Sequence, residues 1–293
     1  MAGRIQPWLL ATRPQTLWAS VAPVVVAAAL AERDDVFRGD IFLVVSAVAL
    51  LLQVAVNYAN DLEDAVRGID TEHRTGPRRA VASGMIAPEP MRVAIAVVVG
   101  LASMCGLYVA WRTGPEMIAI GAVAVVAALG YSGGPRPYAS MGLGELSVFV
   151  FFGPVATVGG RYAFDRTAPL DAWVASVVMG LLAAAILVAN NLRDIPTDRA
   201  TGKRTLAVRL GAPATRRLYL TVVIIAFATV AVGAAAGWLP PWSALALLAV
   251  PVAVPVVRTV ASRATGPALI PALAGTARLM ALTGVLLAVG ALV

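Results

Sequence analysis

Two short runs of carboxylate and carboxamide side chains interrupt an otherwise apolar chain. The first run holds Asn57, Asn60, Asp61 and Asp64. Residues at positions i, i+4 and i+7 of a helix lie on one face, so Asn57, Asp61 and Asp64 are expected to point the same way. Asn60 and Asp64 form a further i, i+4 pair. The spacing therefore predicts a surface of oxygen ligands at a helix end.

The second run repeats this composition later in the chain. Asn190, Asp194 and Asp198 fall at i, i+4 and i+8, which is again one helical face. Pro196 lies between the two aspartates and is a residue that can break a helix. We predict that both runs sit at the ends of apolar helices and lead into polar loops.

Carboxylates that share a helix face at a membrane surface must be solvated, paired or bound to a metal. Mg²⁺ prefers oxygen ligands in an octahedral shell and keeps positions for water and substrate phosphates. Two such runs facing each other predict Mg²⁺ ions that bridge a diphosphate. The plain alternative is a solvated loop in which the aspartates cap helices. The residues that we predict as catalytic metal ligands are Asp61, Asp64, Asp194 and Asp198, and the predicted amide ligands are Asn60 and Asn190.

Basic residues follow both runs and have the chemistry to contact the outer oxygens of a diphosphate. They are Arg67, Arg74, Arg78, Arg79, Lys203 and Arg204. Paired cysteines and His-x-Glu motifs are absent from the sequence, so zinc has no support. Gly202-Lys203-Arg204-Thr205 lacks the upstream glycine spacing of a nucleotide-binding P-loop.

The composition identifies the elements that must carry these residues. Of the 293 residues, 59% are hydrophobic and 13% are charged, whereas soluble domains carry about 25% charged residues. Because backbone groups in lipid must be hydrogen-bonded within the segment, apolar spans are expected to be helices. We predict an all-α polytopic membrane protein, one transmembrane domain over residues 1–293, with polar loops at about 57–91 and 190–215. The nine predicted spans are 15–31, 41–60, 92–111, 115–131, 142–163, 172–193, 216–237, 242–260 and 270–292.

The distribution of basic residues predicts the orientation. With the N-terminus in the cytoplasm, 18 of the 23 basic residues fall on the cytoplasmic side and 5 on the other, as the positive-inside rule expects. The prediction is a plasma-membrane protein with an outer C-terminus and a cytoplasmic active site. The net charge of +7 then reflects orientation, and we expect no nucleic-acid partner. A cleavable signal peptide is the alternative for 15–31, although Pro14 and Pro23 are unusual there.

The two acidic runs are where the chain resembles a known family. Asn60-Asp61-x-x-Asp64 and Asp194-x-x-x-Asp198 look like the two Asp-rich motifs of the UbiA superfamily. Its members are nine-helix enzymes that use Mg²⁺ to move a prenyl chain from its diphosphate to an aromatic or related acceptor. Residues 8–17, 60–70, 76–79 and 131–138, with 142–145 after them, resemble the branch that prenylates 1,4-dihydroxy-2-naphthoate in menaquinone biosynthesis.

One position departs from the general pattern of the family. Gly68 stands where many members have a third aspartate, and Asp70 follows two residues later, as in the naphthoate branch. The resemblance implies Asp70 as a further metal ligand, directly or through water. It also implies a polyprenyl diphosphate as the donor, CO₂ loss from the naphthoate and demethylmenaquinone as the product. The membrane lipid is a further expected partner, since the prenyl tail needs an apolar tunnel lined by residues such as Phe149, Phe151 and Phe152.

The position of the acceptor is predicted from polar residues near the tunnel. Tyr131 and Arg136 lie in a short loop rich in glycine and proline, and Glu145 lies just inside the following helix. We predict that these three residues and Asn57 bind the acceptor.

Other functions remain open at this stage. The acceptor of the same reaction could be 4-hydroxybenzoate or homogentisate. A cation-coupled secondary transporter is an alternative of another class, although such sites lie near the bilayer midplane on broken helices. A scaffold membrane protein would leave both acidic runs unexplained.

Overall fold

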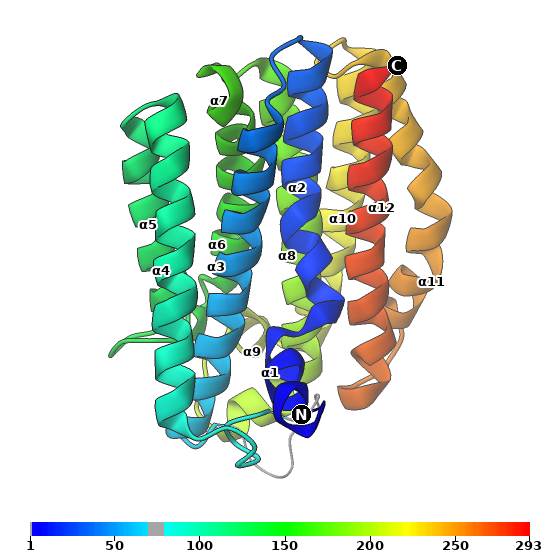
Figure 1. Ribbon diagram of the computed structural model, residues 1–293. Coiled ribbons are helices and arrows are strands. Elements are labelled where there is room, and N and C mark those ends of the chain that lie inside the picture. The colour runs from blue at the N-terminus through cyan, green and yellow to red at the C-terminus, as the bar shows by residue number, and fades with distance from the viewer. Residues whose placement is uncertain (1, 70–78) are drawn as a thin grey trace.

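The computed structural model describes residues 2–69 and 79–293. In those residues the chain is a bundle of helices that run along a common axis, without β-strands (Figure 1). The first half comprises α1 (Ala2–Thr12), α2 (Pro14–Arg33), α3 (Gly39–Val66), α4 (Pro88–Thr113), α5 (Glu116–Gly130), η1 (Tyr138–Met141), α6 (Gly144–Val150), η2 (Phe151–Val158) and α7 (Gly159–Asp165). The second half comprises α8 (Leu170–Ala200), α9 (Leu206–Leu210), α10 (Ala212–Ala235), η3 (Pro241–Ala249), α11 (Val250–Ala261), η4 (Gly266–Leu269) and α12 (Ile270–Leu292).

Eight continuous helical segments in the described residues are long and apolar enough to cross a membrane. The predicted all-helical membrane fold is therefore confirmed. The segment predicted at 115–131 is α5, whose 15 residues extend about 22 Å, less than a hydrocarbon core of about 30 Å. It nevertheless runs beside α4, and the chain termini lie at opposite ends of the bundle, as an odd number of passes requires (Figure 1).

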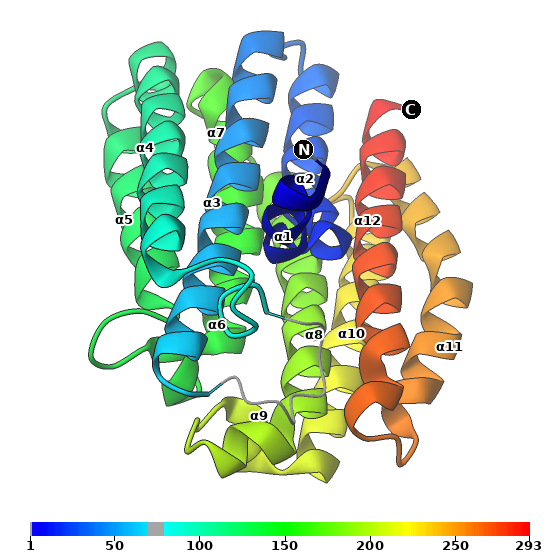
Figure 2. The same ribbon diagram turned by 60° about the horizontal axis from the view of Figure 1, so that its bottom comes forward.

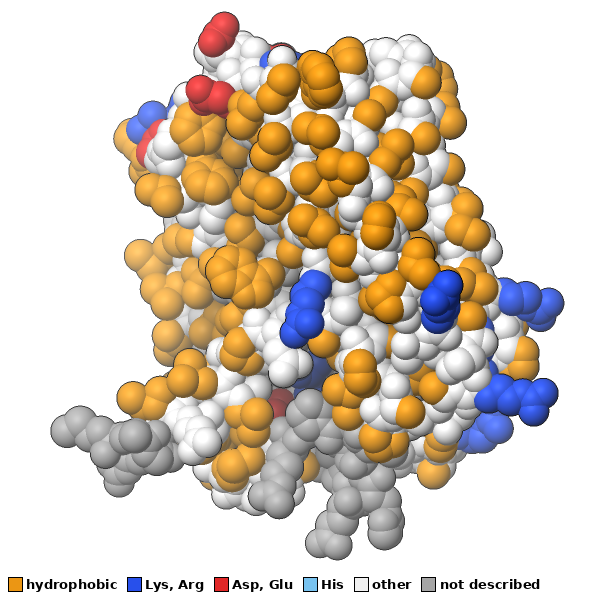
Figure 3. Space-filling model, turned by 90° about the vertical axis from the view of Figure 1, so that its right-hand side faces the viewer, with side chains coloured by type: hydrophobic (Ala, Val, Ile, Leu, Met, Phe, Trp, Pro, Cys, Tyr) orange, Lys and Arg blue, Asp and Glu red, His pale blue; other side chains and the backbone are white. Residues whose placement is uncertain are grey.

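The outer surface of the bundle matches a lipid environment. Figure 3 shows the face formed by α11 and α12, which hydrophobic side chains largely cover. Val252, Val254 and Val285 are among the exposed apolar residues of these segments. Lysine and arginine side chains gather in the lower part of the same view, toward the end at which α1 lies. An apolar belt with a basic border identifies a multi-pass membrane protein.

Helix α8 is the centre of the bundle. In its most apolar stretch 72% of the residues are buried, and Val178, Met179 and Leu182 belong to the main core with residues from α2, α10 and α12. A helix that is apolar on all sides belongs in the interior. At its lower end in Figure 1, α8 continues through Pro196 to Ala200. The proline therefore does not separate Asp194 from Asp198 by a helix break.

The α8 backbone packs closely against the π-helical segment η2. A Cβ atom at Gly153 would lie 2.6 Å from the carbonyl oxygen of Ser176, and one at Gly180 would lie 2.7 Å from that of Phe149. Small residues at such crossings let helix backbones approach in a membrane. Pro154 lies within η2, and the wider turn places Phe151 and Phe152 at a cavity beside α8.

The end of the bundle at which α3 and α8 finish, called here the acidic end, is organised by packing around α1. Trp8 and Ala11 of α1 pack against Tyr58 and Leu62 of α3. Figures 1 and 2 show α1 turned away from the axis of α2 at this end. At the opposite end, Arg161 forms ion pairs with Asp34 and Asp165, which ties α7 to the end of α2.

The close crossing of α8 and η2 gives a stability prediction. Gly180→Ala places a methyl group against backbone, and overpacking of this kind costs about 1–3 kcal/mol. We expect a lower melting temperature for purified Gly180→Ala than for the wild type. Gly100→Ala on α4 is the matched control, because a Cβ atom there meets nothing within 4 Å. Equal melting temperatures for the two variants would contradict the predicted role of Gly180.

Candidate active site

One cavity of about 380 Å³ extends along the bundle between α2, α3, α5, η2 and α8. Its lining changes in character along α3, from Val45 and Leu52 through Gln53 and Asn57 to Asp64. Asp64 lies nineteen positions after Val45, which corresponds to about 28 Å along a helix. The cavity therefore has an apolar part, a polar belt and an acidic part, in that order.

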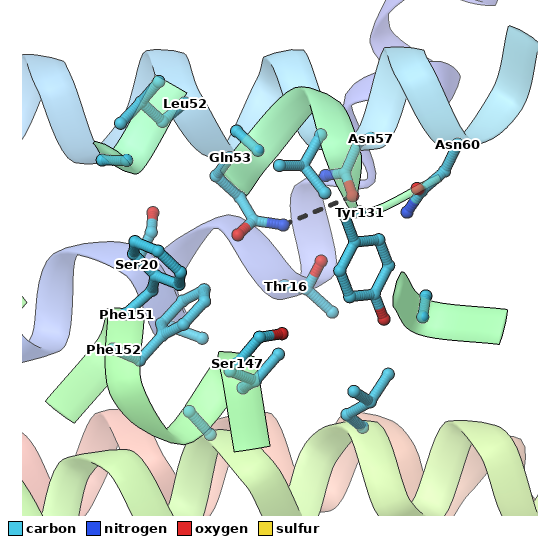
Figure 4. A pocket seen from close by; sticks show the side chains of 18 of the residues that line it. Thr16, Ser20, Leu52, Gln53, Asn57, Asn60, Tyr131, Ser147, Phe151 and Phe152 are labelled. Atoms are coloured by element: carbon cyan, nitrogen blue, oxygen red, sulfur yellow. Dashed lines mark hydrogen bonds between the residues drawn. The ribbon is translucent and has the colours of Figure 1, made fainter. Parts of the chain in front are cut away.

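The other walls show the same sequence of zones. Along α8, Ala183 and Leu187 precede Asn190, Asp194 and Asp198. The polar belt lies between the two ends, and Figure 4 shows several of its side chains around a common space. Its members are Thr16, Ser20, Gln53, Asn57, Tyr131 and Ser147.

The first acidic run is helical, as its spacing predicts, because α3 continues to Val66. Asn57, Asn60 and Asp64 line the cavity, whereas Asp61 is not among the lining residues. Both carboxylate oxygens of Asp61 accept hydrogen bonds from backbone N–H groups, of Ala80 at 3.0 Å and of Val81 at 2.9 Å. Asp61 therefore fixes the chain that returns to α4.

Asp64 joins the two acidic runs through basic partners. Its carboxylate forms ion pairs with Arg79 Nη2 at 3.3 Å and with Lys203 Nζ at 3.3 Å. Arg79 follows the first run in sequence, whereas Lys203 follows the second. Asp64 and Arg79 are both buried, and buried charges need such partners. Lys203, which we predicted to bind the diphosphate, lies at the cavity wall.

The second acidic run also lines the cavity, with Asn190, Asp194 and Asp198 on one side of α8. Arg193 donates to both oxygens of Asp194, at 2.7 and 2.6 Å, and to Oδ1 of Asn190 at 3.0 Å. Asp198 accepts a hydrogen bond from the Thr205 hydroxyl at 3.4 Å. Each carboxylate is therefore held in one direction.

The oxygen donors at the acidic end have the chemistry of a Mg²⁺ site. Asn60, Asp64, Asn190, Asp194 and Asp198 all line the same part of the cavity. In the described residues, groups of three acidic, histidine or cysteine side chains close enough to share one ion are absent. Carboxylates spread around a cavity suit ions that also bind waters and substrate phosphates, because such ions leave part of their shell to other ligands.

The remaining predicted phosphate contacts are distributed differently. Arg67 binds Glu63 at 3.1 Å and the carbonyl oxygen of Gly134 at 2.5 Å, and Arg204 is exposed. Neither residue lines the cavity. The predicted sites at Asp70, Arg74 and Arg78 lie outside the described residues.

The structure places the four predicted acceptor residues in three locations. Asn57 and Tyr131 line the polar belt. Arg136 is exposed and lines a separate shallow hollow with Gly134 and Pro135. Glu145 is buried behind the cavity wall, where its Oε1 accepts a hydrogen bond from Asn191 Nδ2 at 2.9 Å. Its hydrogen bond turns the amide oxygen of Asn191 away from Glu145.

Sequence reasoning missed several residues of this site. In the sequence, Arg13 and Arg193 counted only among the basic residues that predict the membrane orientation. In the structure, Arg193 donates a hydrogen bond to Asp194, and Arg13 lines the cavity. Gln53 was hidden in an apolar span. It lies four residues before Asn57 and donates a hydrogen bond to it at 3.3 Å, so the i, i+4 spacing was the available signal.

Comparisons with known proteins show which family this chain resembles in sequence and in fold. Residues 20–274 match the family model described as "UbiA prenyltransferase family". The chain is 40% identical over 269 residues to 1,4-dihydroxy-2-naphthoate octaprenyltransferase of Mycobacterium tuberculosis, covering 92% of this chain and 91% of the relative. A UbiA homologue from Aeropyrum pernix K1 aligns with a TM-score of 0.70 at 16% identity, covering 94% and 96% of the two chains. A UbiA homologue from Archaeoglobus fulgidus bound to DMAPP and Mg²⁺ aligns with a TM-score of 0.57 at 14% identity, covering 96% and 99%.

The hydrogen bonds of Asp61 predict a large structural effect of its removal. Asp61→Ala leaves two buried N–H groups without this acceptor, at a cost of about 1–3 kcal/mol for each group. We expect a clear fall in the melting temperature of the purified protein. Asp61→Asn keeps one acceptor oxygen, so its melting temperature should lie between those of the wild type and of Asp61→Ala. A melting temperature of Asp61→Ala equal to that of the wild type would disprove the role of Asp61 in fixing this segment.

Proposed function

Because this chain belongs to the UbiA prenyltransferase family, we propose that it transfers a polyprenyl chain from its diphosphate to 1,4-dihydroxy-2-naphthoate. The product, after loss of CO₂, is demethylmenaquinol, the reduced form of demethylmenaquinone, in menaquinone biosynthesis. The observation that carries the proposal is the order of the three zones in one cavity. An allylic diphosphate has a charged head, a reactive first carbon and an apolar tail in the same order.

The diphosphate belongs at the acidic end. Asp64, Asp194 and Asp198, with the side-chain oxygens of Asn60 and Asn190, are the residues that would hold Mg²⁺ there. Asp61 and Asp70 remain predicted ligands in this proposal. When bound, Mg²⁺ supplies positive charge against the charge that grows on the departing diphosphate.

The cations of the chain support the same step. Lys203 and Arg79 already lie beside Asp64, so a diphosphate entering the acidic end meets fixed positive groups. Such preorganised charges stabilise a leaving group without reorganising during the reaction. Arg67, Arg74, Arg78 and Arg204 remain predicted contacts to the outer phosphate oxygens.

The tail of the donor belongs in the apolar part of the cavity. Leu52, Phe151 and Phe152 line this part, and Figure 4 shows both phenylalanine rings beside Ser20 and Ser147. Apolar walls exclude water from the carbocation that forms when the donor ionises. The donor, whose tail is apolar, enters the cavity from the surrounding membrane lipid.

The acceptor belongs in the polar belt, next to the first carbon of the donor. The donor C–O bond breaks, and its electron pair leaves with the diphosphate. A new C–C bond forms to the ring carbon that bears the carboxylate. The bond from that carbon to the carboxyl group then breaks, its electron pair restores the aromatic ring, and CO₂ departs. Asn57 and Tyr131 face the belt as candidate partners of the ring hydroxyls.

The orientation proposal places the acidic end on the cytoplasmic side of the plasma membrane. The N-terminus lies at this end and the C-terminus at the other (Figure 1). The positive-inside rule supports a cytoplasmic position for the end that carries more basic residues. A water-soluble naphthoate then reaches the cavity from the cytoplasm, and the lipid-soluble product leaves into the membrane.

A substrate panel tests the reaction directly. We expect the purified protein with Mg²⁺ to convert 1,4-dihydroxy-2-naphthoate and a polyprenyl diphosphate into a prenylated product and an equal amount of CO₂, measured by product mass and by release of labelled carboxyl carbon. Chelation of divalent cations should abolish turnover. If the protein prenylated 4-hydroxybenzoate or homogentisate but not the naphthoate, the acceptor assigned here would be wrong. Absence of prenyl transfer to any of the three acids would refute the proposed function.

The acidic end gives a second prediction. Asp64→Asn and Asp194→Asn keep the size of each side chain but remove a charge that faces the cavity, so we expect activity to fall at least about 100-fold, as is common when charge stabilisation in a transition state is lost. Glu89→Gln, at an exposed ion pair with Arg92 on α4, should keep wild-type activity. Near-normal prenyl transfer by either folded aspartate variant would contradict the two-cluster site.

A further inference from the structure

Asn191 of α8 is a buried amide that lines the cavity and lies outside the groups assigned to metal, diphosphate or prenyl tail. It follows Leu187 by four residues and precedes Asp194 by three, so these three side chains share one face of the helix. Along that face the cavity lining changes from apolar to acidic. The neighbouring Asn190 is bound by Arg193, whereas Asn191 has a different partner. Asn191 therefore lies at the boundary of the polar belt on α8.

Glu145 determines which way the Asn191 amide points. Asn191 Nδ2 donates a 2.9 Å hydrogen bond to Glu145 Oε1, which lies behind the cavity wall. The oxygen atoms of a carboxylate accept hydrogen bonds, so the amide must present its nitrogen and not its oxygen to them. The Asn191 Oδ1 atom therefore points away from Glu145.

The Asn191 oxygen is open to the cavity. Among the described residues no group donates a hydrogen bond to it, and it does not belong to the polar atoms that are enclosed without a partner. An atom without a partner that is not enclosed must be accessible, and Asn191 lines the cavity. Glu145 Oε2 does belong to the enclosed atoms, so a ligand in the cavity reaches Asn191 and not the carboxylate.

The hydroxyl of Tyr131 brings a donor to the same part of the wall. A Cβ atom at Gly144 would lie 3.5 Å from this hydroxyl and 3.2 Å from Cδ2 of Leu187. Gly144 therefore lets the phenol approach α8 about one helical turn from Asn191. Figure 4 shows the Tyr131 side chain projecting into the cavity, and its hydroxyl has no hydrogen-bond partner among the described residues.

A donor and an acceptor on one wall suit a ligand group that donates and accepts at once. A phenolic hydroxyl does both, whereas a carboxylate or a carbonyl only accepts and would face the Asn191 oxygen with another oxygen. The acceptor of the proposed reaction has two ring hydroxyls. Its 1-hydroxyl is next to the carboxylate and donates to it within the molecule. The 4-hydroxyl is therefore the group that needs partners from the protein.

We propose that Asn191 and Tyr131 bind the 4-hydroxyl of the aromatic acceptor, and that Glu145 is the positioning residue that aims the Asn191 oxygen. The inference rests on the proposed function, because it names a contact of that acceptor. The hydroxyl donates to Asn191 Oδ1 and accepts from the Tyr131 hydroxyl. Sequence reasoning assigned Glu145 itself to the acceptor, but its carboxylate lies behind the wall and acts through Asn191.

This contact contributes to acceptor specificity. Holding the ring at its 4-hydroxyl leaves the carbon that bears the carboxylate free to meet the first carbon of the donor. An acid without this hydroxyl leaves the Asn191 oxygen and the Tyr131 hydroxyl unpaired. A site built to hydrogen-bond a hydroxyl discriminates against analogues that lack it.

Binding of two acids tests the contact without turnover. The wild type, Asn191→Ala and Glu145→Gln are titrated calorimetrically with 1,4-dihydroxy-2-naphthoate and with 1-hydroxy-2-naphthoate, which lacks the 4-hydroxyl. The wild type should bind the dihydroxy acid roughly 10-fold more tightly, as two ordinary hydrogen bonds predict. Asn191→Ala should lose most of this preference. Glu145→Gln should lose part of it, because a carboxamide at this position also donates and then lets the Asn191 amide turn round.

Ser176→Ala is the matched control. It removes a buried hydroxyl of the same helix, which donates to the carbonyl oxygen of Trp173 at 2.7 Å, and Ser176 is not among the described residues that line the cavity. This variant should keep the wild-type preference. Melting temperatures show whether each variant is folded, and Glu145→Gln decides the question if Asn191→Ala is not.

A wild-type preference for the dihydroxy acid in folded Asn191→Ala would overturn the contact, and the same result in Glu145→Gln would overturn the positioning role. An intact preference combined with a raised Mg²⁺ requirement or a raised KM for the prenyl diphosphate in Asn191→Ala would place Asn191 at the metal instead. A wild-type protein that binds both acids but prenylates neither would refute the proposed function, while the ratio of the two affinities still decides the contact.

Discussion

The structure depends on one constraint, which is that charged groups at the end of an apolar helical bundle need partners. In a membrane, an ionised side chain without a partner is expensive. Asp64 is neutralised by Arg79 and Lys203 from two separate segments, and Asp194 by Arg193. The pair of Asp64 with Lys203 connects the end of α3 to the segment that follows α8. These pairs also keep carboxylates at a cavity wall, where a cation and a diphosphate can replace or join the internal partners.

The same constraint orders the cavity. Within the cavity the carboxylates lie at the acidic end, so polarity decreases along α3 and α8 from Asp64 and Asp198 toward Val45 and Ala183. An amphiphilic donor fits such a gradient in one direction only. The reacting carbon, at the junction of head and tail, then falls in the polar belt, where neutral amides and hydroxyls accept a second substrate without competing for the metal.

Much of this could be predicted from the sequence because it is local. The i, i+4 spacing of asparagine and aspartate identified the ligand faces, and long apolar segments identified the helices. Contacts between distant segments were not predictable in this way. The pairing of Lys203 with Asp64, the role of Asp61 in fixing the chain that returns to α4 and the position of Arg13 each depend on how helices pack. Pro196 suggested a break, but α8 continues past it to Ala200 because tertiary packing outweighs a local preference.

The central claim is that one cavity holds the diphosphate between the ends of α3 and α8 and the prenyl tail along Leu52, Phe151 and Phe152. An experimental structure with Mg²⁺ and a donor analogue, in which sulfur replaces the bridging oxygen at the first carbon, tests this most directly. The account predicts metal density between Asp64 and Asp194, with the tail running toward η2. A diphosphate bound elsewhere, or a tail lying outside the bundle, would contradict it.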